Sequence, residues 1–207
     1  MINKRTGSLE IICGSMFSGK TEELIRRIRR AQYAQQSVMS FKHSLDQRHE
    51  IEQVSSHSGI RLTAIPTDNP QTIANFVTTG TQVVGIDEIQ FLSNDIVDVV
   101  VDLIAQGKKV IAGGLDLDFR GIPFSCMPTL MALADSVTKL KAICMRCGQD
   151  AHFSQRLING QPALFDDPII LIGAQECYEA RCRSCFVIDK QMPFAQKTAQ
   201  ENQPEMI

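Results

Sequence analysis

The feature that most constrains this chain is a glycine-rich segment near its start. Residues 14–21 read Gly-Ser-Met-Phe-Ser-Gly-Lys-Thr and match the pattern G-x-x-x-x-G-K-[ST] in full. A short apolar segment, residues 9–13, precedes the motif, and an amphipathic segment, residues 21–35, follows it. In such a strand–loop–helix unit, inward-facing backbone N–H groups and the helix N-terminus bind phosphate groups. The sequence therefore predicts a nucleotide-binding loop made of Gly14, Ser15, Met16, Phe17, Ser18, Gly19, Lys20 and Thr21.

Two acidic residues follow a second buried segment. Residues 82–86 read as a buried strand, and Asp87 and Glu88 come directly after it. With Lys20 on the β- and γ-phosphates and the Thr21 hydroxyl on Mg²⁺, an Asp in this position helps to hold the cation. We assign that role to Asp87, which leaves Glu88 free to accept a proton from an attacking hydroxyl group or water. Neighbouring strand residues point to opposite faces, so both acids reach one site only if the strand ends there.

Strand and helix patterns alternate along most of the chain. Apolar segments predict strands at 9–13, 38–41, 82–86, 109–112 and 137–143. Apolar residues at helical spacing, or a helix-start signal, predict helices at 21–35, 69–78, 95–106 and 129–134. This order predicts an α/β fold with helices flanking a mostly parallel sheet. Residues 44–59 are polar and are expected to form a long loop.

Four of the seven cysteines form two Cys-x₂-Cys pairs, which the 34 residues from 148 to 181 separate. Two such pairs supply four thiolates for a tetrahedral Zn²⁺, and four protein ligands leave no open position, so the metal would be structural. Gly148 after the first pair is typical of the tight turn around such a metal. A redox-active Cys-x-x-Cys or buried free thiols are the alternative interpretations. The predicted zinc ligands are Cys144, Cys147, Cys182 and Cys185.

These patterns divide the chain into three predicted parts. Residues 1–143 form the ATP-binding α/β domain, which carries the phosphate loop. Residues 144–190 form a small zinc-binding, zinc-ribbon-like domain. Residues 191–207 are polar, and we expect this tail to be disordered.

Composition excludes several classes of protein. Twenty-one basic and 23 acidic residues give a formal net charge of −2, which argues against a protein that coats nucleic acid or anionic membranes. No apolar run approaches the roughly 18 residues of a membrane span. The first residues leave no room for the apolar core of a signal peptide. We therefore expect a cytoplasmic protein with reduced thiols that binds neither membrane nor nucleic acid.

The order of the three motifs resembles the cytosolic-type (type II) thymidine kinases. The motifs are the phosphate loop, Asp-Glu-x-Gln-Phe at 87–91 and the two cysteine pairs. Four further elements resemble segments of that family, and the similarity extends from about residue 9 to 187. They are the nucleoside-pocket segment 114–124, the link 133–140 into the zinc domain, the substrate-loop return 178–183, and Lys42 with Asp46 and Arg48.

The resemblance implies transfer of the γ-phosphoryl group of ATP to the 5′-hydroxyl of thymidine, and also of deoxyuridine, in nucleoside salvage for DNA synthesis. Glu88 would be the general base, and the nucleotide and Mg²⁺ would bind the phosphate loop together with Asp87, Glu88, Ile89 and Gln90. The family is typically a homotetramer that thymidine triphosphate inhibits.

The resemblance also implies a nucleoside site. Four apolar residues would surround the base, a loop at 169–173 with Tyr178 would close over it, and Arg48 would neutralise charge on the transferring group. Ser154 stands where the family often has Thr. The implied substrate contacts are Asp46, Arg48, Phe91, Leu115, Phe119, Phe124, Ser154, Ile169, Ile170, Leu171, Ile172, Gly173 and Tyr178.

Three other functions compete with this interpretation. The first is a nucleic-acid-dependent ATPase with a structural zinc ribbon, because Asp87-Glu88-Ile89-Gln90 resembles a helicase-type box; however, 207 residues are too few for two motor domains. The second is a non-enzymatic zinc-ribbon module, which leaves the phosphate loop unexplained. The third is a GTPase, which the lack of an N-K-x-D element disfavours.

Overall fold

A computed structural model describes residues 6–44, 53–55, 61–169 and 176–190. Several predictions fall outside these ranges and are not taken further in structural terms. They concern Asp46, Arg48, Ile170, Leu171, Ile172, Gly173 and the tail 191–207.

The centre of the fold is a six-stranded sheet in which all neighbouring strands are parallel. Strands buried on both faces favour continuous apolar runs, and the two central strands have them, at residues 83–86 and 110–112. The predicted α/β fold with a parallel sheet is thereby confirmed. In spatial order the strands are β5 (Ile65–Thr67), β2 (Val38–His43), β6 (Val83–Asp87), β7 (Lys109–Gly114), β1 (Ser8–Gly14) and β8 (Ser136–Leu140).

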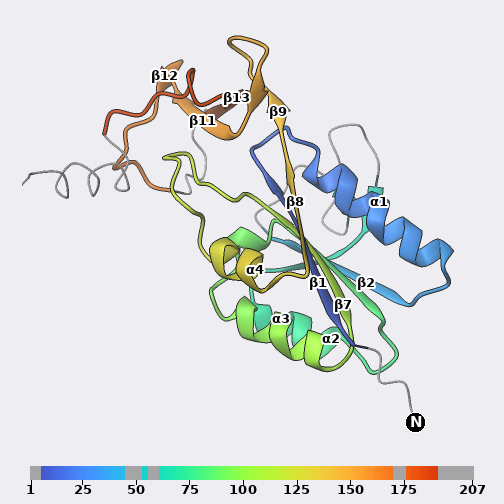
Figure 1. The fold of residues 1–207 in the computed structure, drawn as a ribbon. Coiled ribbons are helices and arrows are strands. Elements are labelled where there is room, and N and C mark those ends of the chain that lie inside the picture. Colours follow the sequence, from blue (N-terminus) through green and yellow to red (C-terminus); the bar gives the residue numbers. More distant parts are fainter. Residues whose placement is uncertain (1–5, 45–52, 56–60, 170–175, 191–207) are drawn as a thin grey trace, which may run out of the picture.

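Helices cover both faces of this sheet (Figure 1). Helix α1 (Lys20–Tyr33) covers one face, where Leu24 and Ile28 pack with Ile12 and Ile111. The other face carries the larger core, in which the buried sides of three helices meet β1, β6 and β7. These helices are α2 (Pro70–Phe76), α3 (Ile96–Ala105) and α4 (Met127–Leu133).

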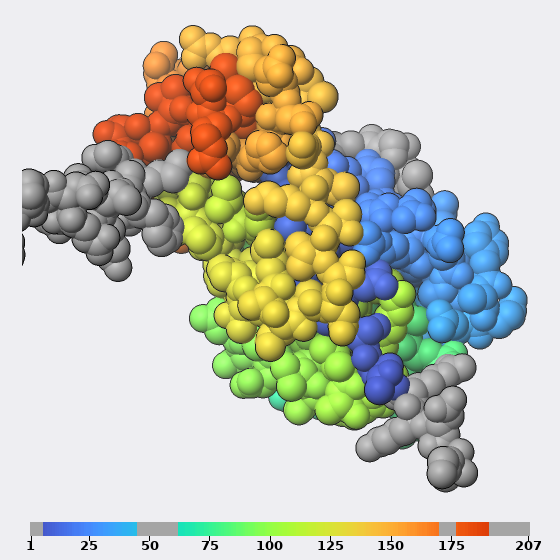
Figure 2. Space-filling model, viewed as in Figure 1, coloured from blue at the N-terminus to red at the C-terminus, as the bar shows by residue number. Residues whose placement is uncertain are grey.

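A smaller unit of short strands follows the central sheet. It lies beyond one end of that sheet, orange to red in Figure 2. β9 (Ala142–Ile143) pairs antiparallel with β10 (Asp150–Ala151). β11 (Phe153–Ile158) lies between β12 (Gln161–Pro162) and β13 (Glu176–Arg181), also antiparallel. Such small sheets bury little apolar surface, so they need further support.

Two predicted elements differ from the structure, and one observed strand was not predicted. The predicted strand 137–143 is two strands, because β8 ends at Leu140 and β9 pairs within the small unit. The predicted loop 44–59 contains β3 (Gln53–Ser55), which pairs with β4 (Arg61–Thr63). The short strand β5 was not predicted. Each depends on pairing with a partner outside its own sequence window, which local patterns do not report. Among the residues described, no helix is long and apolar enough to cross a membrane.

A buried lysine supports the turn between α2 and β6. The Nζ atom of Lys108 donates to the carbonyl oxygens of Thr78, Thr79 and Thr81, at 2.9, 3.0 and 2.7 Å. We expect Lys108→Met to lower the free energy of unfolding by about 2–3 kcal/mol, because three carbonyls lose a charged donor. Lys109→Met is the control: its side chain is 40% exposed and pairs with Glu10, so its loss costs under about 1 kcal/mol. Equal effects in urea unfolding would contradict this assignment.

Candidate functional site

The phosphate loop links the end of β1 to the start of α1. Gly14 and Gly19 have φ angles of 143° and 84°, and Phe17 has φ 65°, so the backbone curls through conformations that favour glycine. A Cβ on Gly14 would lie 2.4 Å from the carbonyl oxygen of Leu140. The Nζ atom of Lys20 donates to the Ser15 carbonyl at 2.8 Å, which holds the ammonium group against the loop.

A hydrogen bond links the first turn of α1 to the end of β6. The Thr21 hydroxyl, in the first turn of α1, donates to Asp87 Oδ2 at the end of β6 at 3.1 Å, although the two residues are 66 positions apart in the sequence. Asp87 is buried, and its burial, followed by the charge of Glu88, raises its pKa to about 7. A hydroxyl and a carboxylate at this spacing, beside Lys20, are the protein ligands that Mg²⁺ uses in phosphate-loop enzymes.

Glu88 lies just beyond the strand. β6 ends at Asp87, and Glu88 has φ 53° before the 3-10 turn η1 (Ile89–Phe91), so the predicted end of the strand is confirmed. The amide of Gln90 donates to Glu88 Oε2 at 2.7 Å, and its oxygen accepts from the Leu115 N–H at 3.1 Å. Gln90 therefore orients the carboxylate of Glu88 and ties it to the segment after β7. Ile89, in contrast, is a fully buried core residue.

Aromatic residues gather beside Glu88. The rings of Phe91 and Phe124 meet edge to face with centroids 5.7 Å apart. His43, at the end of β2, lies 5.7 Å from the Phe91 ring. Burial lowers the pKa of His43, while the charges of Asp68 and Glu88 oppose the shift. Sequence analysis missed His43, because a lone histidine at a strand end carries no signal until β2 and β6 are known to be neighbours.

The small sheet contacts the phosphate loop directly. The Ser154 hydroxyl on β11 accepts a hydrogen bond from the Met16 N–H at 2.9 Å across 138 residues of sequence. Ser15 makes a longer contact of 3.5 Å with the Ala151 carbonyl. On the same sheet, Tyr178 of β13 pairs with Arg156 of β11. Ile169 lies outside the strands and is 40% exposed. Ser154, which was predicted as a substrate contact, holds the backbone of the phosphate loop.

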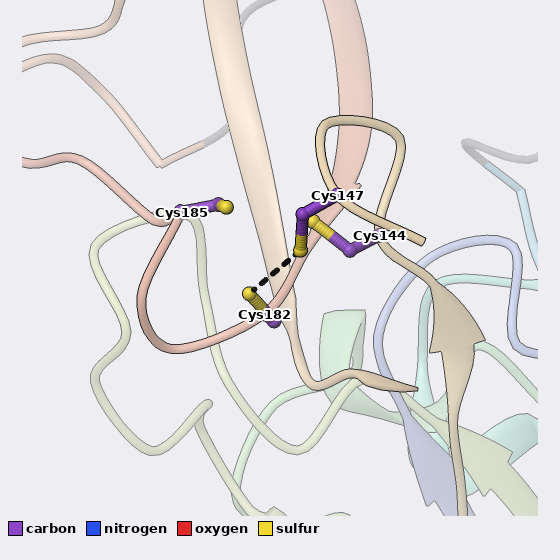
Figure 3. A group of neighbouring side chains, drawn as sticks. All are labelled: Cys144, Cys147, Cys182 and Cys185. Carbon is purple, nitrogen blue, oxygen red and sulfur yellow. Dashed lines mark hydrogen bonds between the residues drawn. The ribbon is translucent and has the colours of Figure 1, made fainter. Parts of the chain in front are cut away.

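The four predicted zinc ligands form one cluster (Figure 3). Their sulfur atoms all lie within 4.8 Å of one another, and those of Cys147 and Cys182 are 3.5 Å apart. Two sulfurs bound to one tetrahedral Zn²⁺ are separated by about 3.8 Å, so the cluster fits the ion. Gly148, with φ 75°, forms the turn after the first pair. None of the seven cysteines forms a disulfide.

The electrostatics of the cluster also favour a cation. The Cys185 thiol donates to the sulfurs of Cys147 and Cys182, which together with burial raises the pKa of Cys185 to about 12. Desolvation opposes ionisation of Cys144, but backbone N–H groups of Cys182, Arg146 and Cys147 lower its pKa to about 6. Four crowded thiols therefore do not ionise together by themselves, whereas a divalent cation stabilises all four thiolates.

A comparison with known protein families decides the assignment. A family model described as thymidine kinase matches residues 7–186. The chain belongs to the thymidine kinase family. Membership implies a nucleoside kinase that uses ATP with Mg²⁺, and thymidine as the nucleoside. The Cys₄ cluster that could hold zinc lies within the matched range.

One solved structure is similar at a lower level. It is the flagellar accessory protein FlaH from Methanocaldococcus jannaschii, with a TM-score of 0.48 and 16% sequence identity. The match covers 69% of this chain and 74% of that chain. A likeness of this size carries no argument about function.

Gly114 is required by the Glu88–Gln90–Leu115 contacts. A Cβ on Gly114 would lie 2.6 Å from Gln90 Oε1, so Gln90 would have to move and release Glu88. We expect Gly114→Ala to slow phosphoryl transfer roughly tenfold or more in steady-state assays. The control is Gly80→Ala, where the nearest atom is the Thr78 hydroxyl oxygen at 3.7 Å. If Gly114→Ala were as active as Gly80→Ala, Gln90 would not orient the site.

Zinc binding is tested by metal analysis. We expect the purified protein to contain about one Zn²⁺ per chain, and Cys147→Ser to lose most of it, because three thiolates bind the ion less tightly. Cys177→Ser is the control, since this exposed thiol lies outside the cluster. Undiminished zinc in Cys147→Ser, measured by atomic emission spectrometry, would disprove the assigned ligand set.

Proposed function

We propose that this protein transfers the γ-phosphoryl group of Mg·ATP to the 5′-hydroxyl of thymidine, and also of deoxyuridine. The observation that carries the proposal is the junction of Thr21, Asp87 and Glu88. At this junction the predicted Mg²⁺ site, formed by Thr21 and Asp87, lies beside a second carboxylate, that of Glu88, which Gln90 orients. A phosphate loop alone fits many nucleotide-binding proteins, whereas the second carboxylate supplies a base for an acceptor hydroxyl.

Each part of the site has a role in this reaction. Backbone N–H groups of the phosphate loop and the Lys20 ammonium group bind the β- and γ-phosphates. Thr21 and Asp87 would hold Mg²⁺, which neutralises charge on the phosphates. Glu88 accepts the proton of the 5′-hydroxyl as the O5′–Pγ bond forms and the bond from Pγ to the bridging oxygen breaks, leaving ADP and the nucleoside 5′-monophosphate.

The aromatic cluster supplies a place for the base. Phe91 comes three residues after Glu88 and its ring meets that of Phe124, while the Leu115 N–H is hydrogen-bonded to Gln90, which contacts Glu88. A pyrimidine held against these residues would bring its sugar toward Glu88. The remaining proposed contacts are Asp46, Arg48, Phe119, Ser154, Tyr178 and the loop 169–173.

The zinc cluster is proposed to be structural. Its ligands come from the turn between β9 and β10 and from the segment after β13, so they join both sides of the small unit. Zinc there would fix the ends of the chain segment between β11 and β13, which includes residues 169–173. With four thiolate ligands, no coordination position is left for substrate.

Further properties are proposed from the sequence patterns and from the family resemblance. They are a division at residue 143 into an ATP-binding domain and a zinc-binding domain, assembly into a homotetramer, and inhibition by thymidine triphosphate. A cytoplasmic location and a role in nucleoside salvage for DNA synthesis complete the proposal.

The central test replaces Glu88. We expect Glu88→Gln to lower kcat for thymidine phosphorylation by about 10²–10⁴, because the amide does not accept the proton. Asp102→Asn, on the exposed side of α3, is the control for loss of a carboxylate and should retain full activity. Product is measured as thymidine 5′-monophosphate by chromatography.

Two results would contradict the proposal at different levels. Equal kcat for Glu88→Gln and the native protein would remove Glu88 from its role as the base. No phosphorylated nucleoside, together with ATP hydrolysis that DNA or RNA stimulates, would favour the nucleic-acid-dependent ATPase instead.

A further inference from the structure

Cationic and aromatic side chains alternate between the segment after β7 and the small unit. The guanidinium carbon of Arg156 lies 4.9 Å from the centroid of the Phe119 ring, and that of Arg120 lies 6.0 Å from the same ring. Arg120 also lies 5.3 Å from the Phe165 ring, which Lys190 contacts at 5.6 Å. We call these five residues the cation–aromatic ladder. It joins the segment after β7 to the segment before residue 169.

Arg156 is the buried end of the ladder. Its exposed fraction is 0%, although arginine is rarely buried unless its charge is paired. Its Nη1 atom donates to the carbonyl oxygen of Pro168, next to Ile169. One guanidinium group therefore contacts a proposed base-pocket residue, Phe119, and the backbone where the proposed substrate loop begins.

The strand that carries Arg156 also reaches the phosphate loop. Residues 154 and 156 share one face of β11, since strand side chains alternate. On that face, Ser154 accepts the hydrogen bond from Met16. The residue between them, Gln155, instead bonds the backbone N–H and carbonyl of Val187, at 2.8 and 3.0 Å. One face of β11 thus contacts the phosphate loop, the pocket segment and the loop start.

We propose that Arg156 is a positioning residue of the nucleoside site. Its guanidinium group contacts both the Phe119 ring and the Pro168 carbonyl, and so fixes their positions relative to each other. The base-pocket segment is thereby held in a fixed position relative to the start of the substrate loop. This role rests on the proposed function. Arg156 belongs neither to the phosphate loop nor to the junction of Thr21, Asp87 and Glu88, so its loss should weaken nucleoside binding rather than ATP binding.

The test compares Arg156→Lys and Arg156→Met with the native protein. Lysine keeps the charge but lacks the planar group that stacks on a ring and donates in a fixed direction, so both variants should be impaired. We expect KM for thymidine to rise roughly tenfold or more, while KM for ATP stays within about twofold, as loss of ground-state binding predicts. The proposal would be overturned if the KM values for thymidine and ATP rose equally, or if neither value rose.

A matched control separates this effect from a general loss of structure. Arg30 is exposed on α1 and belongs to neither the small unit nor the proposed nucleoside site, so Arg30→Met removes a guanidinium group elsewhere on the protein. We expect it to leave both KM values unchanged. Zinc content and thermal midpoint are measured for every variant, and Arg156→Lys should match the native protein in zinc content.

A double-mutant cycle tests whether Arg156 acts through Phe119. If it does, Arg156→Met combined with Phe119→Leu raises KM for thymidine no further than the more damaging single change. If the increases in KM for thymidine of the two single variants instead multiply in the double variant, the two residues act independently, and the proposal is overturned. Because the native protein is assayed alongside, failure of the proposed function is distinct: it would appear as no phosphorylation of thymidine by the native chain.

Discussion

The parallel pairing of β1, β6 and β7 determines where everything else lies. Parallel strands end at the same edge of a sheet, so the segments that follow them meet there whatever their separation in sequence. The phosphate loop follows β1, Asp87 ends β6, and Leu115 follows β7. The hydrogen bonds from Thr21 to Asp87 and from Leu115 to Gln90 are consequences of this register. A slip by one residue would turn Asp87 away from the loop.

The small unit completes the site because it is bonded to this same edge. Met16 in the phosphate loop donates to Ser154, and Arg156 two residues further contacts Phe119 and Pro168. Short sheets like these bury few apolar side chains, and their core is mainly alanine and cysteine. A four-thiolate zinc site, as proposed for the Cys₄ cluster, would supply rigidity that packing alone does not provide. In this way a metal without an open coordination position would still affect substrate binding.

The sequence predicted those parts of the site that local patterns encode. The glycine-rich loop, the acids at a strand end and the cysteine pairs each depend on spacing within a few residues, and the structure brings the four cysteines together. Residues whose contacts depend on distant partners carried no signal in the sequence. His43 meets Phe91 because β2 neighbours β6, and Arg156 meets Phe119 because β11 packs against that segment. Gln90 was predicted as a nucleotide contact, which stays a prediction, and its hydrogen bonds join Glu88 to Leu115.

The central claim is that the residues at this edge of the sheet catalyse phosphoryl transfer from ATP to a nucleoside rather than to water. The most direct measurement follows the γ-phosphate of isotopically labelled ATP, with and without thymidine, and identifies the labelled products by mass spectrometry. The account predicts that, with thymidine present, nearly all label leaves ATP as thymidine 5′-monophosphate, with little free phosphate. Release of labelled inorganic phosphate at the same rate with and without thymidine would contradict it.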